Sequence, residues 1–158
     1  MGYTAAELKE KITLGRDSIF RVAPLGVNGA MPAAAAYKEL CLASEVTVGF
    51  ENRTISFQNF CTGGDEIEIP VGSTGSVDLS EMQWIEDDEA LAIMETAARD
   101  LAPIAYEYLP AGAGTGKTVY RGIMDVKSWK VKSASDGTVT VESPTLGAPG
   151  KPEKGTLT

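Results

Sequence analysis

The segment most suggestive of chemistry is the glycine-rich run at residues 111–118, A-G-A-G-T-G-K-T. It satisfies the loose phosphate-binding pattern, in which backbone N–H groups cradle phosphates and a lysine reaches the terminal phosphate. That chemistry requires a helix directly after the loop, because the helix N-terminus holds the anion. The residues that follow, V-Y-R-G-I, indicate a strand instead. We interpret the run as a flexible hairpin loop with a solvated Lys117, with ATP or GTP binding as the alternative.

Two acidic clusters raise the question of a metal site. Residues 86–89, E-D-D-E, precede an apolar run, and negative charge is favoured in the first turn of a helix. Asp65, Glu66 and Glu68 lack the spacing of a known calcium loop, and Glu66 and Glu68 share the polar face of an expected strand. Solvated surface explains both clusters, so we expect no metal site.

The chain contains no histidine. This absence removes the commonest general base, the commonest metal ligand and the Ser-His and Cys-His nucleophile pairs. Cys41 and Cys61 do not form a C-x-x-C pair, and their spacing leaves open whether they are bonded. We expect both to be free, buried thiols. We therefore expect no catalytic residues, no cofactor and no enzymatic activity.

Composition limits the possible partners. The 158 residues suit one domain with a core, and the net charge is −8. Proteins that grip nucleic acid usually neutralise phosphates with Lys and Arg, so this acidic chain is a poor candidate for holding DNA or anionic lipid. Neither a signal peptide nor a membrane-spanning apolar run is present, which predicts a protein made in the cytoplasm.

Alternation of apolar and polar residues predicts a mainly β fold, a β-sandwich of about eight antiparallel strands. The expected strand segments are 18–23, 45–50, 53–60, 66–71, 76–84, 104–108, 117–126, 129–132 and 137–142. We expect a tight hairpin at Glu51 and Asn52, a turn at residues 72–75 and a β-bulge near Glu81. Asp136 and Gly137 predict a further hairpin.

Two helices are expected beside the strands. Thr4 and Glu7 fit a capping box, which predicts a short N-terminal helix ending before Gly15. A flanking helix at about residues 86–101 has its apolar stripe on one face and is stopped by Pro103. The stripe consists of Leu91, Met94, Ala98 and Leu101.

The domain organisation follows from these elements. Residues 1–142 form one domain, which includes a long loop at residues 24–36. Prolines and glycines recur after Ser143, so we expect residues 143–158 to be an extended C-terminal arm without regular structure. The loop carries Leu25, Val27 and Met31, which either fold back on their own domain or meet a neighbouring subunit.

Three stretches of the chain resemble the tail tube (major tail protein) family of siphophages. They are C-L-A-S-E-V-T-V-G-F-E-N-R-T-I-S-F-Q-N-F from Cys41, V-G-S-T-G-S-V-D-L-S-E-M-Q-W from Val71, and V-Y-R-G-I-M-D-V-K-S-W-K-V-K-S-A-S-D-G-T-V-T-V-E-S-P from Val119. With the acidic-start helix between them, the resemblance extends over about two thirds of the chain. The tube proteins of contractile tails and of type VI secretion are similar at the level of fold.

The resemblance implies a structural protein of the phage virion, made in the host bacterial cytoplasm. It implies homo-hexameric rings whose inner strands join into one barrel and which stack into a tube that conducts DNA. The implied partners are the tape measure, tail-tip and tail-terminator proteins, with no membrane. An acidic lumen would repel phosphates, so that DNA slides without sticking.

Within this framework, two sets of residues become site candidates. We expect Glu66 and Glu68 to face the channel, and Leu25, Val27 and Met31 to contact the next ring. Two other classes remain open as alternatives. One is a different virion part, such as a capsid decoration or tail-completion protein, and the other is a β-sandwich module that binds carbohydrate or protein.

Overall fold

The computed structural model describes residues 2–158, and it is dominated by β-strands. One layer is a six-stranded antiparallel sheet in the order β10-β7-β6-β1-β2, with β11 also paired to β7. Its strands are β1 (Ile19–Pro24), β2 (Lys38–Glu39), β6 (Ile104–Leu109), β7 (Thr118–Val126), β10 (Leu146–Gly147) and β11 (Glu153–Thr156).

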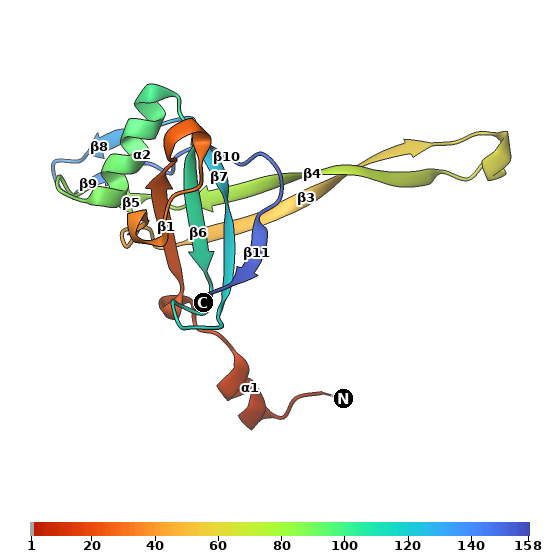
Figure 1. Ribbon diagram of the computed structural model, residues 1–158, viewed down its shortest axis with the longest axis horizontal. Helices are drawn as coiled ribbons and strands as arrows, with labels where there is room; N and C mark the ends of the chain where they lie inside the picture. Colours follow the sequence, from red (N-terminus) through yellow and green to blue (C-terminus); the bar gives the residue numbers. More distant parts are fainter. Residues whose placement is uncertain (1) are drawn as a thin grey trace.

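The second layer combines a long two-stranded ribbon with a small three-stranded sheet (Figure 1). The ribbon is β3 (Val46–Phe57) paired with β4 (Ile67–Leu79), and the small sheet is formed by β5 (Met82–Gln83), β9 (Val139–Val141) and β8 (Val131–Ser133). Val77, Leu79, Met82 and Val141 bury their side chains in the same cluster as Tyr106 of the main sheet. The expected mainly β fold with a flanking helix is confirmed.

The flanking helix α2 (Glu89–Asp100) packs on the same face of the main sheet as this second layer. Its buried side chains are Ala90, Leu91, Met94 and Ala97. The side chain of Asp88 caps the N-terminus by accepting a hydrogen bond from the Leu91 N–H at 2.9 Å, so the helix begins later than the acidic run suggests. Leu101 lies in the left-handed region beyond the last turn and is exposed, so its expected place in the apolar stripe is wrong.

Helix α1 (Ala5–Lys11) has the predicted capping box: the Thr4 hydroxyl accepts from the Glu7 N–H, and the Glu7 carboxylate accepts from the Thr4 N–H at 2.7 Å. These hydrogen bonds lower the pKa of Glu7 below its ordinary value, with the backbone bond as the larger cause. No residue of α1 is buried, and the helix lies away from the two layers (Figure 1).

The predicted breaks in the ribbon are wrong. Strand β3 runs through Glu51 and Asn52, where a hairpin was expected, and β4 runs through residues 72–75, where a turn was expected. The pairing register instead shifts once, between Arg53 and Thr54, where Val71 is the extra residue on β4. A bulge and a turn both shift which alternate positions of a segment are apolar. The alternation alone therefore did not distinguish a bulge from a turn.

The bulge expected near Glu81 is also absent. Strand β4 ends at Leu79 and the chain resumes as β5 at Met82, which pairs with β9 in another sheet. The Ser80 hydroxyl oxygen at this crossing accepts hydrogen bonds from the N–H groups of Ser44 and Glu45 at 3.0 and 3.1 Å. Near Glu81, the shift in the alternation of apolar residues therefore marks the point where the chain passes from one sheet to another.

The C-terminal segment is extended but not irregular, which corrects the expectation for residues 143–158. It returns along β7, where Leu146 pairs with Val126 and Glu153 pairs with Arg121. The hairpin predicted at Asp136 and Gly137 is confirmed, because it joins the antiparallel strands β8 and β9.

Candidate functional site: a protruding hairpin arm

The most prominent surface feature is the part of the ribbon that leaves the two layers, which we call the hairpin arm (residues 50–75). The two strands stay paired from Val46 with Leu79 to Phe57 with Ile67, and residues 58–66 close the tip. Twelve residues of β3, at about 3.3 Å each, make a ribbon about 40 Å long. Figure 1 shows it extending well beyond the remainder of the molecule.

The base of the hairpin arm is fixed to the body of the protein. Val77 and Leu79 are buried in the main core, and Val46 and Val48 pack against it. Gly75 marks the point of closest approach, because a Cβ there would overlap the carbonyl oxygen of Gly150 in the C-terminal segment. A glycine is required where two backbones cross at this distance. The base of the hairpin arm is therefore held in a fixed position on the body of the protein.

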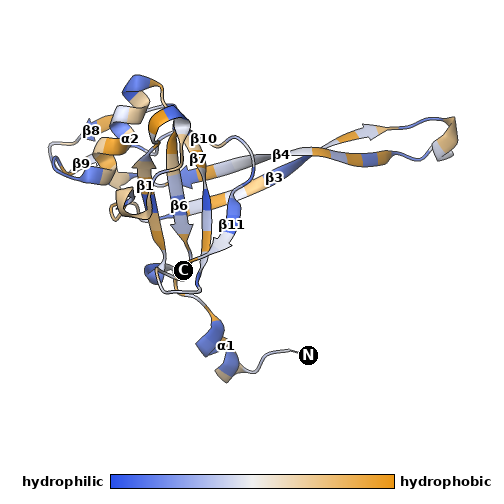
Figure 2. Cartoon of the chain, viewed as in Figure 1, coloured by the Kyte–Doolittle hydropathy of each residue, from blue (hydrophilic) through white to orange (hydrophobic). Residues whose placement is uncertain are grey.

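Beyond the base, apolar residues recur on both strands and at the tip (Figure 2), and their side chains are exposed. They are Phe50, Ile55, Phe57, Phe60, Ile67, Ile69 and Val71. Phe60 is fully exposed, at 104% of its reference area. Isolated exposed apolar residues are ordinary, but a contiguous set of this kind marks an interaction surface.

The register shift gives the hairpin arm two differently directed apolar stretches. Near the base, Val46 and Val48 share one face with Leu79 and Val77 and pack on the protein's own core. Past the shift, Ile55 and Phe57 occupy the alternate positions of β3, on the other face of the pleat, beside Ile69 and Ile67. The base thus serves the fold, whereas the outer part faces away from its own core.

The tip is ordered and acidic. The Asn59 side-chain oxygen accepts from the N–H groups of Cys61 and Thr62 at 2.9 and 3.1 Å, in a second capping box. Glu66 and Glu68 lie exposed where β4 begins, next to Asp65. No Lys or Arg occurs between Arg53 and Arg99, so the outer part of the arm is purely anionic.

This arrangement suits association rather than catalysis. An isolated two-stranded ribbon is marginally stable in water, and its unpaired strand edges are templates for pairing with another chain. Within residues 2–158, no group of three or more His, Cys, Asp or Glu side chains is placed to hold a metal ion. The glycine-rich run at residues 111–118 is the predicted loop, with β7 and no helix directly after it.

The residues predicted as sites lie in two separate regions. Val27 is 85% exposed and Met31 is also exposed, whereas Leu25 packs against Tyr37, Ala23 and Ala105. All three belong to the loop after β1, and Glu66 and Glu68 lie on the hairpin arm.

Both cysteines are free and exposed, so the expectation that they are buried is wrong.

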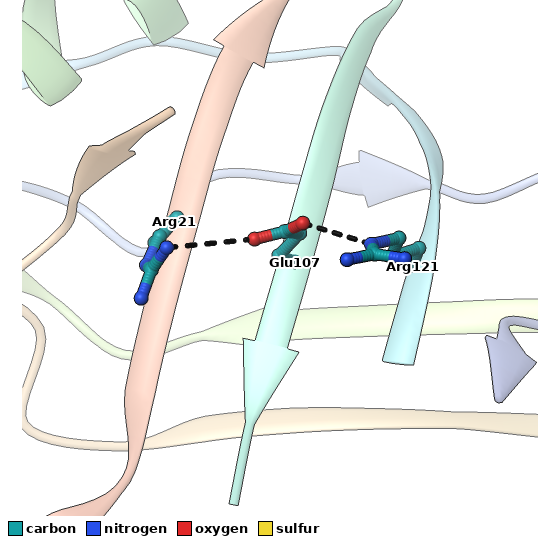
Figure 3. A network of polar contacts seen from close by, with 3 residues as sticks. All are labelled: Arg21, Glu107 and Arg121. Atoms are coloured by element: carbon teal, nitrogen blue, oxygen red, sulfur yellow. Dashed lines mark hydrogen bonds and ion pairs between the residues drawn. The ribbon is translucent and has the colours of Figure 1, made fainter. Parts of the chain in front are cut away.

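A second feature is a polar row across the main sheet (Figure 3). Arg21, Glu107 and Arg121 lie in register on β1, β6 and β7. The Arg121 Nε donates to Glu107 Oε1 at 2.8 Å, and an Arg21 guanidinium nitrogen lies 3.8 Å from Glu107 Oε2. Glu107 is only 2% exposed, although the alternation of β6 suggested a solvated side chain.

The hairpin arm was not predicted from the sequence, because the residues that indicate it are spread over a long segment. The available signal was a long stretch without Lys or Arg that carried apolar residues in both alternation frames. Glu107 had no signal in its own strand, because its two partners come from strands elsewhere in the chain.

In the part of the chain that the structure describes, no helix is both long and apolar enough to cross a membrane.

Comparison with known proteins gives matches by structure and none by sequence. No protein-family model matches the chain, and no curated protein matches it. The solved SPP1 tail tube superposes with a TM-score of 0.69 at 14% identity, over 92% of this chain and 80% of that one. The tail of an empty gene transfer agent (GTA) particle, refined with C6 symmetry, superposes with a TM-score of 0.65 at 12% identity, over 93% and 100%.

A third match is the virion of the native gene transfer agent particle, with a TM-score of 0.64 at 10% identity. These likenesses cover 92–93% of this chain. They agree with the resemblance drawn from the three stretches between Cys41 and Pro144. The chain therefore has the fold of the siphophage tail tube proteins.

Proposed function

We propose that this protein is a structural, non-enzymatic subunit of a phage tail, which self-associates into stacked rings that form the tail tube. The observation that carries the proposal is the hairpin arm, whose outer apolar side chains remain exposed within residues 2–158. The fold shared with the SPP1 tail tube supports the same conclusion. The protein would then reside in the virion after synthesis in the host cytoplasm.

The geometry of the hairpin arm favours a head-to-tail contact between copies. The arm differs from the surface that receives it, so each copy offers one donor and one acceptor. Contacts of this kind close into rings when the rotation permits, and they propagate along an axis when it does not. The C6 symmetry of the similar gene transfer agent tail supports hexameric rings here.

Charge fits a tube that conducts DNA. The net charge of −8 and the anionic outer part of the hairpin arm would repel phosphate, so DNA would pass without specific binding. We assign Glu66 and Glu68 to the lumen and Leu25, Val27 and Met31 to the contact with the next ring. The tape measure, tail-tip and tail-terminator proteins are the further partners of such a tube.

Electron microscopy of the purified protein at low and high concentration tests this proposal. We expect rings or hollow tubes from the full chain. A shortened variant, in which residues 51–74 are replaced by Asn-Gly, keeps Phe50 opposite Gly75 and joins them by a two-residue turn. It should remain a folded monomer, because Val46, Val48, Val77 and Leu79 still pack on the core.

Two outcomes would contradict the proposal. Tubes formed by the shortened variant would show that the hairpin arm is not the assembly element. Monodisperse particles of the full chain, at both concentrations and after addition of tail-tip components, would favour a capsid decoration protein or a binding module.

A further inference from the structure

An open hollow lies on the face of the main sheet that α2 does not cover. Successive residues of a strand point to opposite faces, and Tyr106 of β6 packs in the core with Met94 of α2. Glu107, the next residue, therefore points to the other face. There it lines a hollow of about 520 Å³, beside Tyr37 and Arg121.

The walls of this hollow are apolar and its rim carries two cations. Met31, Pro32 and Ala34 approach from the loop after β1, and Ile123 and Pro149 complete the apolar lining. Arg121, with 41% of its side chain exposed, and Lys151 supply positive charge. Glu153 also lines the hollow, while Glu107 is already matched by Arg21 and Arg121.

The floor of the hollow contains an acceptor that lacks a donor. Glu107 is 2% exposed, and within residues 2–158 its Oε2 atom has no hydrogen-bond partner. The nearest guanidinium nitrogen of Arg21, at 3.8 Å, is too distant to donate. Buried carboxylate oxygens are normally hydrogen-bonded, so Glu107 is incompletely hydrogen-bonded within its own chain.

We propose that the tip of the hairpin arm of one copy docks into this hollow of a second copy. The tip presents the fully exposed Phe60 to the apolar walls, and the exposed Asp65 to Arg121 and Lys151. This inference rests on the proposed function, and it identifies the surface that receives the arm.

The occupant is a second copy because the tip does not reach the hollow of its own chain. Figure 1 shows the tip at the far end of the ribbon, away from β6 and β7, which form the floor of the hollow. Gly75 and the buried base residues hold the arm in that direction. The contact is therefore head-to-tail, as stacked rings require.

A rival hollow of similar size is less suited to the same tip. It lies between α2 and residues 24–29, and its lining includes Leu25, Ile93 and Pro103. Asp100 is the single charged residue in that lining, and the C-terminal end of α2 adds negative partial charge. An acidic tip is repelled there, whereas the first hollow has no net negative charge, because Arg121 and Lys151 balance Glu107 and Glu153.

The native Cys61, exposed beside Phe60, provides a direct test. In a Cys41→Ser background, Ala34→Cys places a thiol on the rim of the proposed hollow, and Thr96→Cys places one on the rival hollow. A short bis-maleimide added to assembled protein should link copies of the Ala34→Cys variant into a ladder of oligomers. The Thr96→Cys variant should remain at the level of the background.

The same samples are inspected by electron microscopy, so that the two proposals can be separated. Tubes without a link between Cys61 and the cysteine at position 34, or with a link to position 96 instead, would overturn the docking proposal and leave the tube intact. Absence of both tubes and links would overturn both. Links at position 34 within tubes support both.

Charge exchange gives a second measurement that leaves Arg121 with its Glu107 contact. Asp65→Lys or Lys151→Glu alone should raise the protein concentration needed for assembly about tenfold, equivalent to about 1.4 kcal/mol. The double variant should restore assembly, since the two charges are reversed together. If each single variant weakens assembly and the double variant does not restore it, the assigned contact between Asp65 and Lys151 is wrong.

Discussion

Ile55 and Ile69 are direct cross-strand partners on the hairpin arm, and 53% and 42% of their areas are exposed. No other element of residues 2–158 covers this pair, although a buried side chain of this size gains about 1.5–3 kcal/mol. The monomer does not gain the free energy of burying Ile55 and Ile69, so burial of this pair can stabilise an assembly.

The exposed face of the hairpin arm can be tested with neighbouring substitutions. Ile55→Lys places a charge on the apolar face, and Ser56→Lys places the same charge on the opposite face, across from Glu68. We expect Ile55→Lys to abolish tube formation, because a charge is costly to bury, and Ser56→Lys to preserve it. Sedimentation velocity measures both. Equal behaviour of the two variants would show that the apolar face is not an interface.

Val27→Asp should give a folded monomer that cannot form tubes. Val27 is highly exposed, so the substitution should change the free energy of unfolding by less than about 0.5 kcal/mol. Asn28→Asp adds the same charge at the next position, where Asn28 already has a left-handed backbone that aspartate tolerates. Tube formation by Val27→Asp, seen by electron microscopy, would remove this residue from the contact between rings.

Glu107→Gln should destabilise the fold, since it leaves Arg21 and Arg121 without their shared counterion. Partial exposure of both guanidinium groups reduces the loss to roughly 2 kcal/mol, below the value for a fully buried pair. Urea unfolding of the monomeric, arm-shortened protein measures it. Glu81→Gln is the control, because its pair with Lys132 is exposed and should contribute under about 0.5 kcal/mol. Similar losses in both variants would contradict the prediction.

Gly122→Ala should cost about 2 kcal/mol through overpacking. A Cβ at this position would lie 2.6 Å from the hydroxyl oxygen of Tyr106, a residue buried in the core. Gly137→Ala is the matched control, because the nearest atom to its Cβ, in Ala134, would be 3.7 Å away. Thermal unfolding compares the two variants. An unchanged melting temperature for Gly122→Ala would mean that Tyr106 moves freely.

The thiol of Cys41 should react only at raised pH. Although Cys41 is exposed, partial desolvation first, and then Glu39 and Asp88, raise the pKa of Cys41 above its ordinary value. The thiolate is the reactive form, so in a Cys61→Ser variant the alkylation rate should reach its midpoint at a higher pH than that of cysteine in an unstructured peptide. Glu39→Gln should move the midpoint downward. A midpoint at or below that of the peptide would contradict this.

Local patterns in the sequence predicted the elements whose partners are near in the chain. The Thr4 and Glu7 capping box, the apolar face of α2 and the hairpin at Asp136 depend on neighbouring residues, and each is present. The alternation at residues 104–108 likewise predicted β6.

Contacts between residues far apart in the sequence could not be predicted in this way. The glycines near Gly72 indicated a turn, yet they permit a bulge and a close backbone crossing within one continuous strand. Glu107 alternates like a surface residue, but it is buried between its partners on β1 and β7. Both outcomes depend on which distant strands become neighbours, which no local pattern contains.

The most direct test of the account is a cryo-electron microscopy map of the assembled protein. We expect density for residues 50–75 of each copy packed against a neighbouring copy, with Ile55, Ile69 and Phe60 buried in that contact. A map of tubes in which the hairpin arm extends freely into solvent would contradict the central claim that this arm joins the subunits.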